Sequence, residues 1–132
     1  FIDKYIGDAI MALFATRADD ALHAAVQMQA RVDELNGSSE GGRFPNITIG
    51  IGIHTGKTML GIVGEAERYQ GTVISDAVNL ASRLEGLTKK AGHPIIVSSA
   101  TVALLEETFP LRVLGNARVK GKTGPIKVYT FI

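Results

Sequence analysis

The chain has 132 residues and a formal net charge of +1, with 45% hydrophobic and 20% charged residues. This length and balance predict one globular domain and exclude a disordered chain. So small a net charge provides no overall field that would attract nucleic acid or an anionic membrane. The sequence contains no cysteine, which excludes a disulfide framework and a thiolate metal site. No stretch is long and apolar enough for a membrane span, so we expect a cytoplasmic domain; any membrane anchor of the parent protein would belong to other segments.

The first fourteen residues are expected to form a hairpin that turns at Gly7-Asp8. The chain starts at Phe1, already within an apolar stretch, so we expect a fragment cut inside a domain. Asp8 would lie at the tip of the hairpin. A carboxylate there is either a turn residue or a ligand for a cation, and both interpretations stay open.

The next segments predict a helix, a loop and two strands. Residues 19–35 form an amphipathic helix, with Asp19 and Asp20 in its first turn. Residues 37–43 form a loop rich in glycine and serine. Residues 47–55 alternate as a strand whose Gly50 and Gly52 share one face, so another backbone is expected to pack closely there. A second strand is expected at 58–63. The apolar stripe of the helix comprises Ala21, Ala25, Met28, Val32 and Leu35.

The stretch from Gly71 to Gly86 predicts a helix with two distinct faces. Asn79 and Arg83 stand one turn apart on its polar face. Such a face is either simply solvated or able to hold a polar anionic ligand. The buried stripe is predicted to contain Ile74, Ala77, Val78, Ala81, Leu84 and Thr88.

The remaining residues complete an α+β domain with a mostly antiparallel sheet. We expect a strand at 94–97, a helix capped by Ser98 or Ser99 that runs to about Glu107, extended pieces at 109–114 and 117–119, and a strand at 125–132. The three histidines, at positions 23, 54 and 93, lack metal-ligand spacing and are interpreted as structural. The triplet Gly56-Lys57-Thr58 fails as a phosphate-binding loop because the required earlier glycine is Ile51.

Three segments together resemble the catalytic domain of the class III nucleotidyl cyclases. They are Lys4-Tyr-Ile-Gly-Asp8, Thr72-Val-Ile-Ser-Asp-Ala-Val-Asn79-Leu-Ala-Ser-Arg83 and Val119-Lys120-Gly-Lys122. The resemblance implies a ferredoxin-like β-α-β-β-α-β core and head-to-tail homodimers with two sites at the interface. It also implies attack of the ribose 3′-oxygen on the α-phosphorus of a nucleoside triphosphate, giving a cyclic monophosphate and pyrophosphate.

The same resemblance implies a role for each matching residue. Asp8 corresponds to the second of two aspartates that hold two Mg²⁺ or Mn²⁺ ions. Arg83 corresponds to the arginine that stabilises charge at the α-phosphate, and Asn79 to the residue that orients the ribose. Lys120 corresponds to the lysine that binds the terminal phosphates.

Lys4 and Thr72 correspond to the pair that reads the base, and they favour ATP. Lysine can donate to adenine N1, and a threonine oxygen can accept from the 6-amino group. Guanylyl cyclases of the family typically carry glutamate at the Lys4 position. Two other interpretations remain: a guanylyl cyclase, and a cyclase-like module that binds nucleotide or dimerises without turnover.

The chain departs from the family pattern at its start. The first metal-binding aspartate should lie upstream of Phe1, together with the first strand and the helices that bracket the phosphates. We therefore expect residues 1–132 to be the C-terminal three-quarters of a single cyclase domain, inactive when alone.

Overall fold

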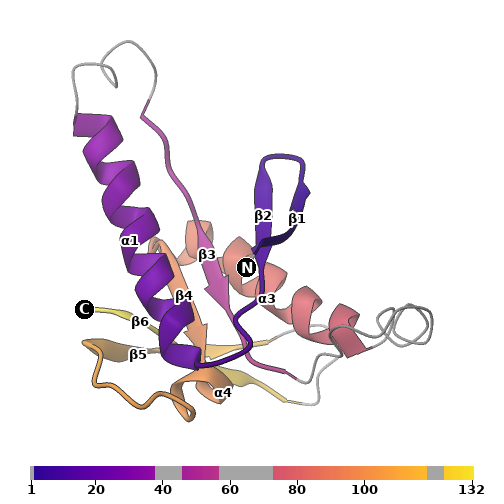
Figure 1. Cartoon of the computed structure of the whole chain (residues 1–132). Coiled ribbons are helices and arrows are strands. Elements are labelled where there is room, and N and C mark those ends of the chain that lie inside the picture. The colour runs from indigo at the N-terminus through magenta and orange to yellow at the C-terminus, as the bar shows by residue number, and fades with distance from the viewer. Residues whose placement is uncertain (1, 38–45, 57–72, 119–123) are drawn as a thin grey trace.

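The computed structural model describes residues 2–37, 46–56, 73–118 and 124–132 (Figure 1). In chain order, the elements are β1 (Ile2–Ile6), β2 (Ala9–Ala12), α1 (Ala18–Gly37), β3 (Ile51–Ile53), α3 (Val73–Ala91), β4 (Ile95–Ser98), α4 (Ser99–Val102), β5 (Leu111–Ala117) and β6 (Ile126–Phe131). None of the helices in these ranges is long and apolar enough to cross a bilayer.

Four strands form one mixed sheet in the order β3-β4-β6-β5. The pairing of β3 with β4 is parallel, whereas β6 pairs antiparallel with both β4 and β5. Two of the three pairings are therefore antiparallel, and the predicted α+β class is confirmed. A parallel pair requires a crossover between its strands, and α3 lies in the chain between β3 and β4.

Helices α1 and α3 cover opposite faces of this sheet (Figure 1). Strand β4 is buried throughout, and its side chains alternate between the two faces. Ile95 and Val97 pack with Leu22 and Ala25 of α1, whereas Ile96 packs with Leu84 of α3 and Val128 of β6. The sheet is thus the middle layer of three, with one apolar cluster on each side.

The hairpin β1–β2 is confirmed as a separate two-stranded antiparallel sheet. Ile6 pairs with Ala9, so Gly7 and Asp8 form a two-residue turn. Gly7 has φ of 60°, a value that glycine adopts readily and that a type II′ turn requires at its first central position. The turn therefore leaves Asp8 exposed at the tip.

The helix α1 differs from the prediction in the face it buries. Ala25 of the predicted stripe is buried, but Met28 and Leu35 are 43% and 42% exposed, and the buried Leu22 was not predicted. The reason is that only the first half of α1 packs against the sheet. Further along, the Asn36 side chain exchanges two 2.8 Å hydrogen bonds with the backbone of Ile47, which ties the end of α1 to an extended segment outside the sheet.

Two predicted strand boundaries were also wrong. The strand predicted at 47–55 is paired only over Ile51–Ile53, which lie opposite Ile95–Val97 of β4. The pieces predicted at 109–114 and 117–119 are replaced by one strand, β5. Its pairing with β6 is irregular between Val113 and Gly115, where Gly115 has φ of 149°, and then continues to Ala117. The strand predicted at 58–63 and almost all of the loop predicted at 37–43 lie outside the described residues.

The helix predicted from Ser98 or Ser99 to Glu107 ends at Val102. Beyond it, Leu104 and Leu105 make tighter i to i−3 backbone bonds to Thr101 and Val102. The next two amides, of Glu106 and Glu107, donate to the Asp19 carboxylate instead of continuing the helix. A tertiary contact from α1 thus replaces a further helical turn.

Candidate functional site

The helix α3 has a buried face and an exposed face, as its sequence predicts. Leu84 and Thr88 are buried, Ala77, Val78 and Ala81 are half-buried, and the Ile74 side chain lies outside the described residues. The prediction overlooked Leu80, which is 2% exposed. The exposed face contains Asn79, Ser82, Arg83 and Gly86.

The glycines of the β3 segment explain how closely α3 approaches the sheet. A Cβ atom at Gly52 would overlap the backbone of Ala81 and Glu85, and one at Gly50 would overlap the Thr88 side chain. Even a small side chain would therefore push the helix away. The expectation that another backbone packs against these glycines is confirmed.

Asn79 and Arg83 are the two predicted site residues that the structure brings together. They lie four residues apart on the exposed face of α3, so their side chains leave one rigid helix from adjacent turns. An amide that both donates and accepts thus stands beside a forked guanidinium cation. This pair suits a ligand that has both hydroxyl and phosphate oxygens.

The other predicted site residues are not joined to this pair. Asp8 lies on the separate hairpin, where it is exposed. The backbone of Lys4 pairs with Met11, but its side chain lies outside the described part of the structure. Thr72 and Lys120 also fall outside it. Within one chain, the structure therefore presents the predicted residues in two places and leaves three of their side chains undescribed.

The described residues contain no group of three or more His, Asp or Glu side chains able to hold a metal ion. Asp8 alone is an exposed carboxylate on a short turn, which is a suitable hard oxygen donor for Mg²⁺. Proteins commonly bind this ion through one or two carboxylates and complete its shell with water and substrate phosphates. Asp8 thus fits the role of one ligand, and further oxygens must complete the site.

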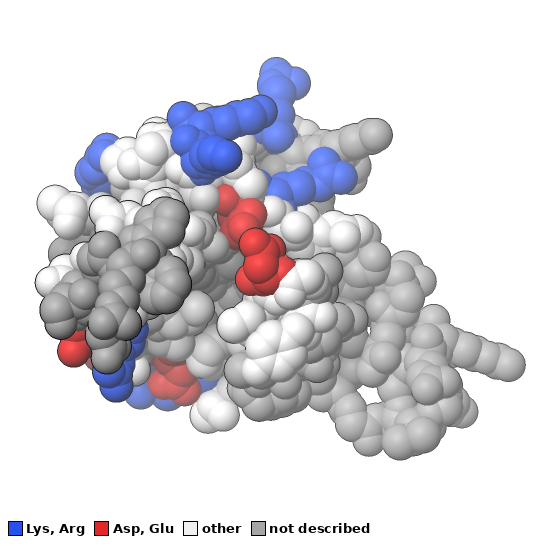
Figure 2. All heavy atoms as spheres, turned by 90° about the horizontal axis from the view of Figure 1, so that it is seen from above, with Lys and Arg blue, Asp and Glu red and all other residues white. Residues whose placement is uncertain are grey.

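No single charge dominates the face of the molecule seen from above in Figure 2. Basic side chains gather along one side of this face, and acidic side chains lie between them and its centre. A hollow elsewhere lies on the α1 side of the sheet, away from the helix that presents Asn79 and Arg83; it is lined by Ala24, Gln27, Met28, Arg31, Val32 and Ile49. The mixture of basic and acidic side chains on the face seen in Figure 2 agrees with the small net charge of the sequence.

The histidines lie in three different environments. His23 Nε2 lies 3.0 Å from both carboxylate oxygens of Glu107, and His93 Nε2 lies 3.2 Å from Nη2 of Arg112. His54 Nδ1 lies 2.9 Å from Ser98 Oγ. The sequence did not predict these partners, because each lies far from its histidine in the chain and no local spacing indicates the contact.

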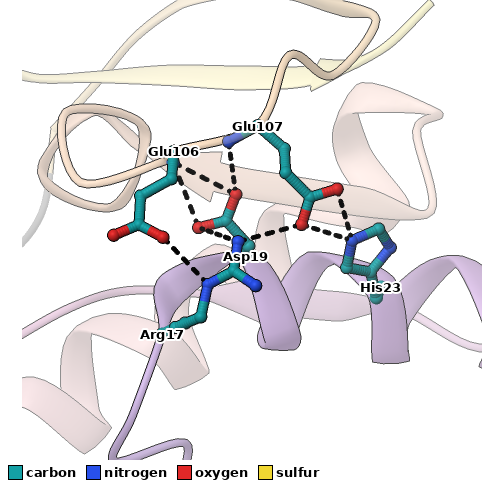
Figure 3. A network of polar contacts seen from close by, with 5 residues as sticks. All are labelled: Arg17, Asp19, His23, Glu106 and Glu107. Atoms are coloured by element: carbon teal, nitrogen blue, oxygen red, sulfur yellow. Dashed lines mark hydrogen bonds and ion pairs between the residues drawn. The ribbon is translucent and has the colours of Figure 1, made fainter.

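A charged cluster joins the start of α1 to the segment that follows α4 (Figure 3). The Asp19 carboxylate has no exposed surface and accepts from the amides of Glu106 at 3.1 Å and Glu107 at 2.7 Å. Arg17 Nη2 donates to Glu107 Oε2 at 3.0 Å and lies 3.7 Å from Asp19 Oδ1, and its Nε lies 3.0 Å from Glu106 Oε2. The cluster fastens these two segments together on the α1 side of the sheet.

The environment of Asp19 favours its ionised form. Burial by itself would raise the pKa of the Asp19 carboxyl, but the amides of Glu107 and Glu106 and the nearby Arg17 outweigh this and lower the pKa below its ordinary value. Burial likewise opposes the charge of Arg17, yet the surrounding carboxylates of Asp19, Glu106 and Glu107 raise the Arg17 pKa above its ordinary value. Both groups are therefore charged near neutral pH.

Comparison with known proteins relates the chain to cyclases. Residues 4–132 match the family described as the adenylate and guanylate cyclase catalytic domain. The chain is 49% identical to an adenylate cyclase of Anabaena cylindrica, 40% to a terminal-differentiation specific adenylate cyclase of Dictyostelium discoideum and 33% to adenylate cyclase 1 of Rhizobium meliloti. These alignments cover 98%, 100% and 99% of the chain but only 27%, 6% and 21% of the relatives. By its match over almost its whole length, the chain belongs to the family of adenylate and guanylate cyclase catalytic domains.

Proposed function

We propose that this domain converts ATP to 3′,5′-cyclic AMP and pyrophosphate. The ribose 3′-oxygen attacks the α-phosphorus, the bond from that phosphorus to the bridging oxygen of the β-phosphate breaks, and the proton of the 3′-hydroxyl is released. The observation that carries the proposal is the exposed Asn79 and Arg83 pair on α3 in a chain of the cyclase family. The names of the three relatives, all adenylate cyclases, support ATP as the nucleotide.

Arg83 would stabilise the negative charge that increases on the α-phosphate oxygens as the new bond forms. Its guanidinium is planar and can contact two oxygens at once. Asn79, one turn earlier, would hydrogen-bond the ribose and direct its 3′-oxygen toward the phosphorus. Both effects reduce the activation barrier because a rigid helix orients the two groups before the reaction begins.

Asp8 would hold a divalent cation at the hairpin tip, with phosphate oxygens and water completing the shell. A bound Mg²⁺ or Mn²⁺ supplies positive charge that neutralises the triphosphate and lowers the pKa of the 3′-hydroxyl. Lys120 would bind the terminal phosphates by charge. Lys4 and Thr72 would read the base, donating to adenine N1 and accepting from the 6-amino group.

The site would be complete only in a head-to-tail homodimer. Asp8 belongs to a hairpin outside the four-stranded sheet, whereas Asn79 and Arg83 belong to a helix packed on it. In such a dimer, the hairpin of one protomer would face α3 of its partner, so each site would combine both groups. Loss of dimerisation would then remove activity even with every catalytic side chain present.

The main test measures cyclic nucleotide formation by the natural full-length protein with Mg²⁺ or Mn²⁺. Asp8→Ala should abolish metal-dependent turnover, whereas Asp33→Ala, which removes an exposed carboxylate of α1, should leave it unchanged. A protein that binds ATP but forms no cyclic product in its wild-type state would instead be a binding or dimerisation module. An Asp8→Ala variant that keeps a normal response to metal concentration would remove Asp8 from the site.

The choice of base is tested by Lys4→Glu. Glutamate accepts hydrogen bonds and so suits the N1 proton of guanine, which adenine lacks. The ratio of kcat/KM for ATP to that for GTP should fall by about 10-fold or more, since a mismatched hydrogen bond in a binding site is costly. A wild-type preference for GTP would assign the domain as a guanylyl cyclase.

A further inference from the structure

A cluster of four hydrogen-bonding side chains lies where β3 and β4 end. His54 and Thr55 follow β3, Ser98 ends β4, and Thr101 belongs to α4. His54 Nδ1 lies 2.9 Å from Ser98 Oγ, Thr55 Oγ1 lies 2.8 Å from Thr101 Oγ1, and the Ser98 and Thr101 hydroxyls are 3.4 Å apart. Ser98 and Thr101 are almost completely buried, at 0% and 1% exposure. Two adjacent parallel strands are therefore tied together at their carboxyl ends by side chains.

Ser98 occupies a position where its hydroxyl would ordinarily serve its own helix. It is the N-cap residue of α4 and has extended backbone angles, yet its side chain makes no capping hydrogen bond. A serine at this position normally accepts from an amide in the first helical turn. The predicted N-cap position of Ser98 is confirmed, but its hydroxyl is engaged with His54 and Thr101 instead of capping the helix.

The strand that His54 ties down is also the strand on which α3 rests. Gly52 lies against the backbone of Ala81 and Glu85, and a Cβ atom added to Gly56 would come within 2.8 Å of the Ala77 Cβ. His54 stands between these two glycines, and its Nε2 is 3.9 Å from that Cβ position. The end of β3 thus fixes how closely the first half of α3 approaches the sheet.

The residues of α3 that touch this strand alternate with those of the exposed pair. Ala77 and Ala81 face the glycines, whereas Asn79 and Arg83 follow each of them by two residues. Residues two apart on a helix point about 200° apart, and thus to nearly opposite sides. A shift of α3 relative to Gly52 and Gly56 would therefore move Asn79 and Arg83 by the same amount.

From this geometry we infer that His54 is a positioning residue for the cyclase reaction, an inference that rests on the proposed function. Its hydrogen bond to Ser98 holds the end of β3 against β4. The end of β3 in turn fixes the position of α3, and α3 presents Asn79 and Arg83 to the nucleotide. Catalysis is sensitive to such placement, because a displacement of about 1 Å can cost about 100-fold in rate.

The test compares His54→Leu with His54→Asn in the natural full-length protein. Leucine fills the space but cannot bond Ser98, so kcat should fall by about 10-fold or more while KM for ATP changes far less. Asparagine places a polar atom near the former Nδ1 and should recover most of kcat. The matched control is His93→Leu, which removes a half-buried histidine bonded to Arg112 and should leave turnover at the wild-type level.

A double-mutant cycle distinguishes positioning from general support of the fold. If His54 acts through α3, the further loss from His54→Leu should be much smaller once Arg83 has been replaced by alanine. An equal loss in both backgrounds would overturn the inference. Ser98→Ala provides a second variant in case His54→Leu does not fold, and it should lower kcat in the same direction.

Failure of this inference differs from failure of the proposed function. If Arg83→Ala and Asp8→Ala remove turnover while a folded His54→Leu protein keeps the wild-type kcat, only the positioning role is lost. If Arg83→Ala keeps full turnover, the proposed site itself is wrong.

Discussion

The two helices that enclose the sheet are attached to it by different means. α1 is held at its start by the charged cluster, in which the Asp19 carboxylate accepts two amides from the segment after α4, and by the apolar side chain of Leu22. α3 is held by the apolar side chain of Leu84 and by close contact of Gly52 with its backbone and of Gly50 with the Thr88 side chain. Apolar burial contributes on both sides of the sheet, but α1 adds a charged cluster, whereas α3 adds close approach to two glycines.

The difference separates stability from function in this domain. On the α1 side, the polar groups of Arg17, Asp19 and Glu107 contact one another, so few are left to bind a ligand. On the α3 side, Ala81 and Leu84 face the sheet, and Asn79 and Arg83 lie on the outer surface. Changes at the α1 cluster should therefore alter unfolding, and changes on the outer face of α3 should alter turnover.

The largest effect on stability is expected from Leu22→Ala. Leu22 has no exposed surface and packs with Ile53, Ile95 and Val97. Removing a buried leucine side chain typically lowers the free energy of unfolding by about 2–5 kcal/mol. Urea unfolding followed by circular dichroism measures this loss. Met28→Ala, on the exposed part of the same helix, is the control and should change it by only about 0.5 kcal/mol.

A comparable loss, but in turnover, is expected from Arg83→Ala. In the full-length protein, cyclic nucleotide formation should fall by about 100-fold or more, which corresponds to about 2.7 kcal/mol of transition-state stabilisation. The urea midpoint should stay unchanged, because Arg83 lies on the exposed face of α3. Arg112→Ala removes an exposed arginine of β5 and serves as the control. Unchanged turnover in Arg83→Ala would exclude Arg83 from the mechanism.

Patterns along single segments predicted much of this architecture. Alternation around Ile51 and Ile53, the Gly7-Asp8 turn and the 3.6-residue period of α3 each identified an element and the face it buries. The paired glycines at 50 and 52 correctly indicated a closely packed partner. Local periodicity records which side chains avoid water, and that is enough to place strands and helices in a layered fold.

The sequence failed where distant residues decide the outcome. Nothing near Asp19 indicates that its carboxylate will take the amides of Glu106 and Glu107 and so end α4 early. The sequence around Met28 does not indicate that this half of α1 extends beyond the sheet. The pairing of His54 with Ser98 across 44 residues is equally invisible to a local pattern. Resemblance to the cyclases supplied the candidate residues, and the structure describes the surroundings of Asp8, Asn79 and Arg83 among them.

The smallest effect, and the most specific to the α1 side, concerns the pH dependence of stability. Because the pKa of Asp19 is lower in the folded protein than its ordinary value of about 3.9, its ionised form stabilises the fold at neutral pH. This contribution should disappear as the pH falls from about 5 through the lowered pKa, since the unfolded chain then binds the proton first. The raised pKa of Arg17 acts only at strongly alkaline pH and does not affect this range.

Asp19→Asn should therefore lower the urea midpoint at pH 7 and make it less dependent on pH between about 5 and 3. The amide keeps one oxygen acceptor for the Glu107 N–H but loses the charge that faces Arg17. Asp20→Asn changes the neighbouring carboxyl, which makes none of these contacts, and should preserve the wild-type slope. Parallel pH curves for the wild type and Asp19→Asn would show that the charge of Asp19 does not hold α1 in place. A loss of turnover in the folded Asp19→Asn protein would instead link this cluster to α3 on the opposite face of the sheet.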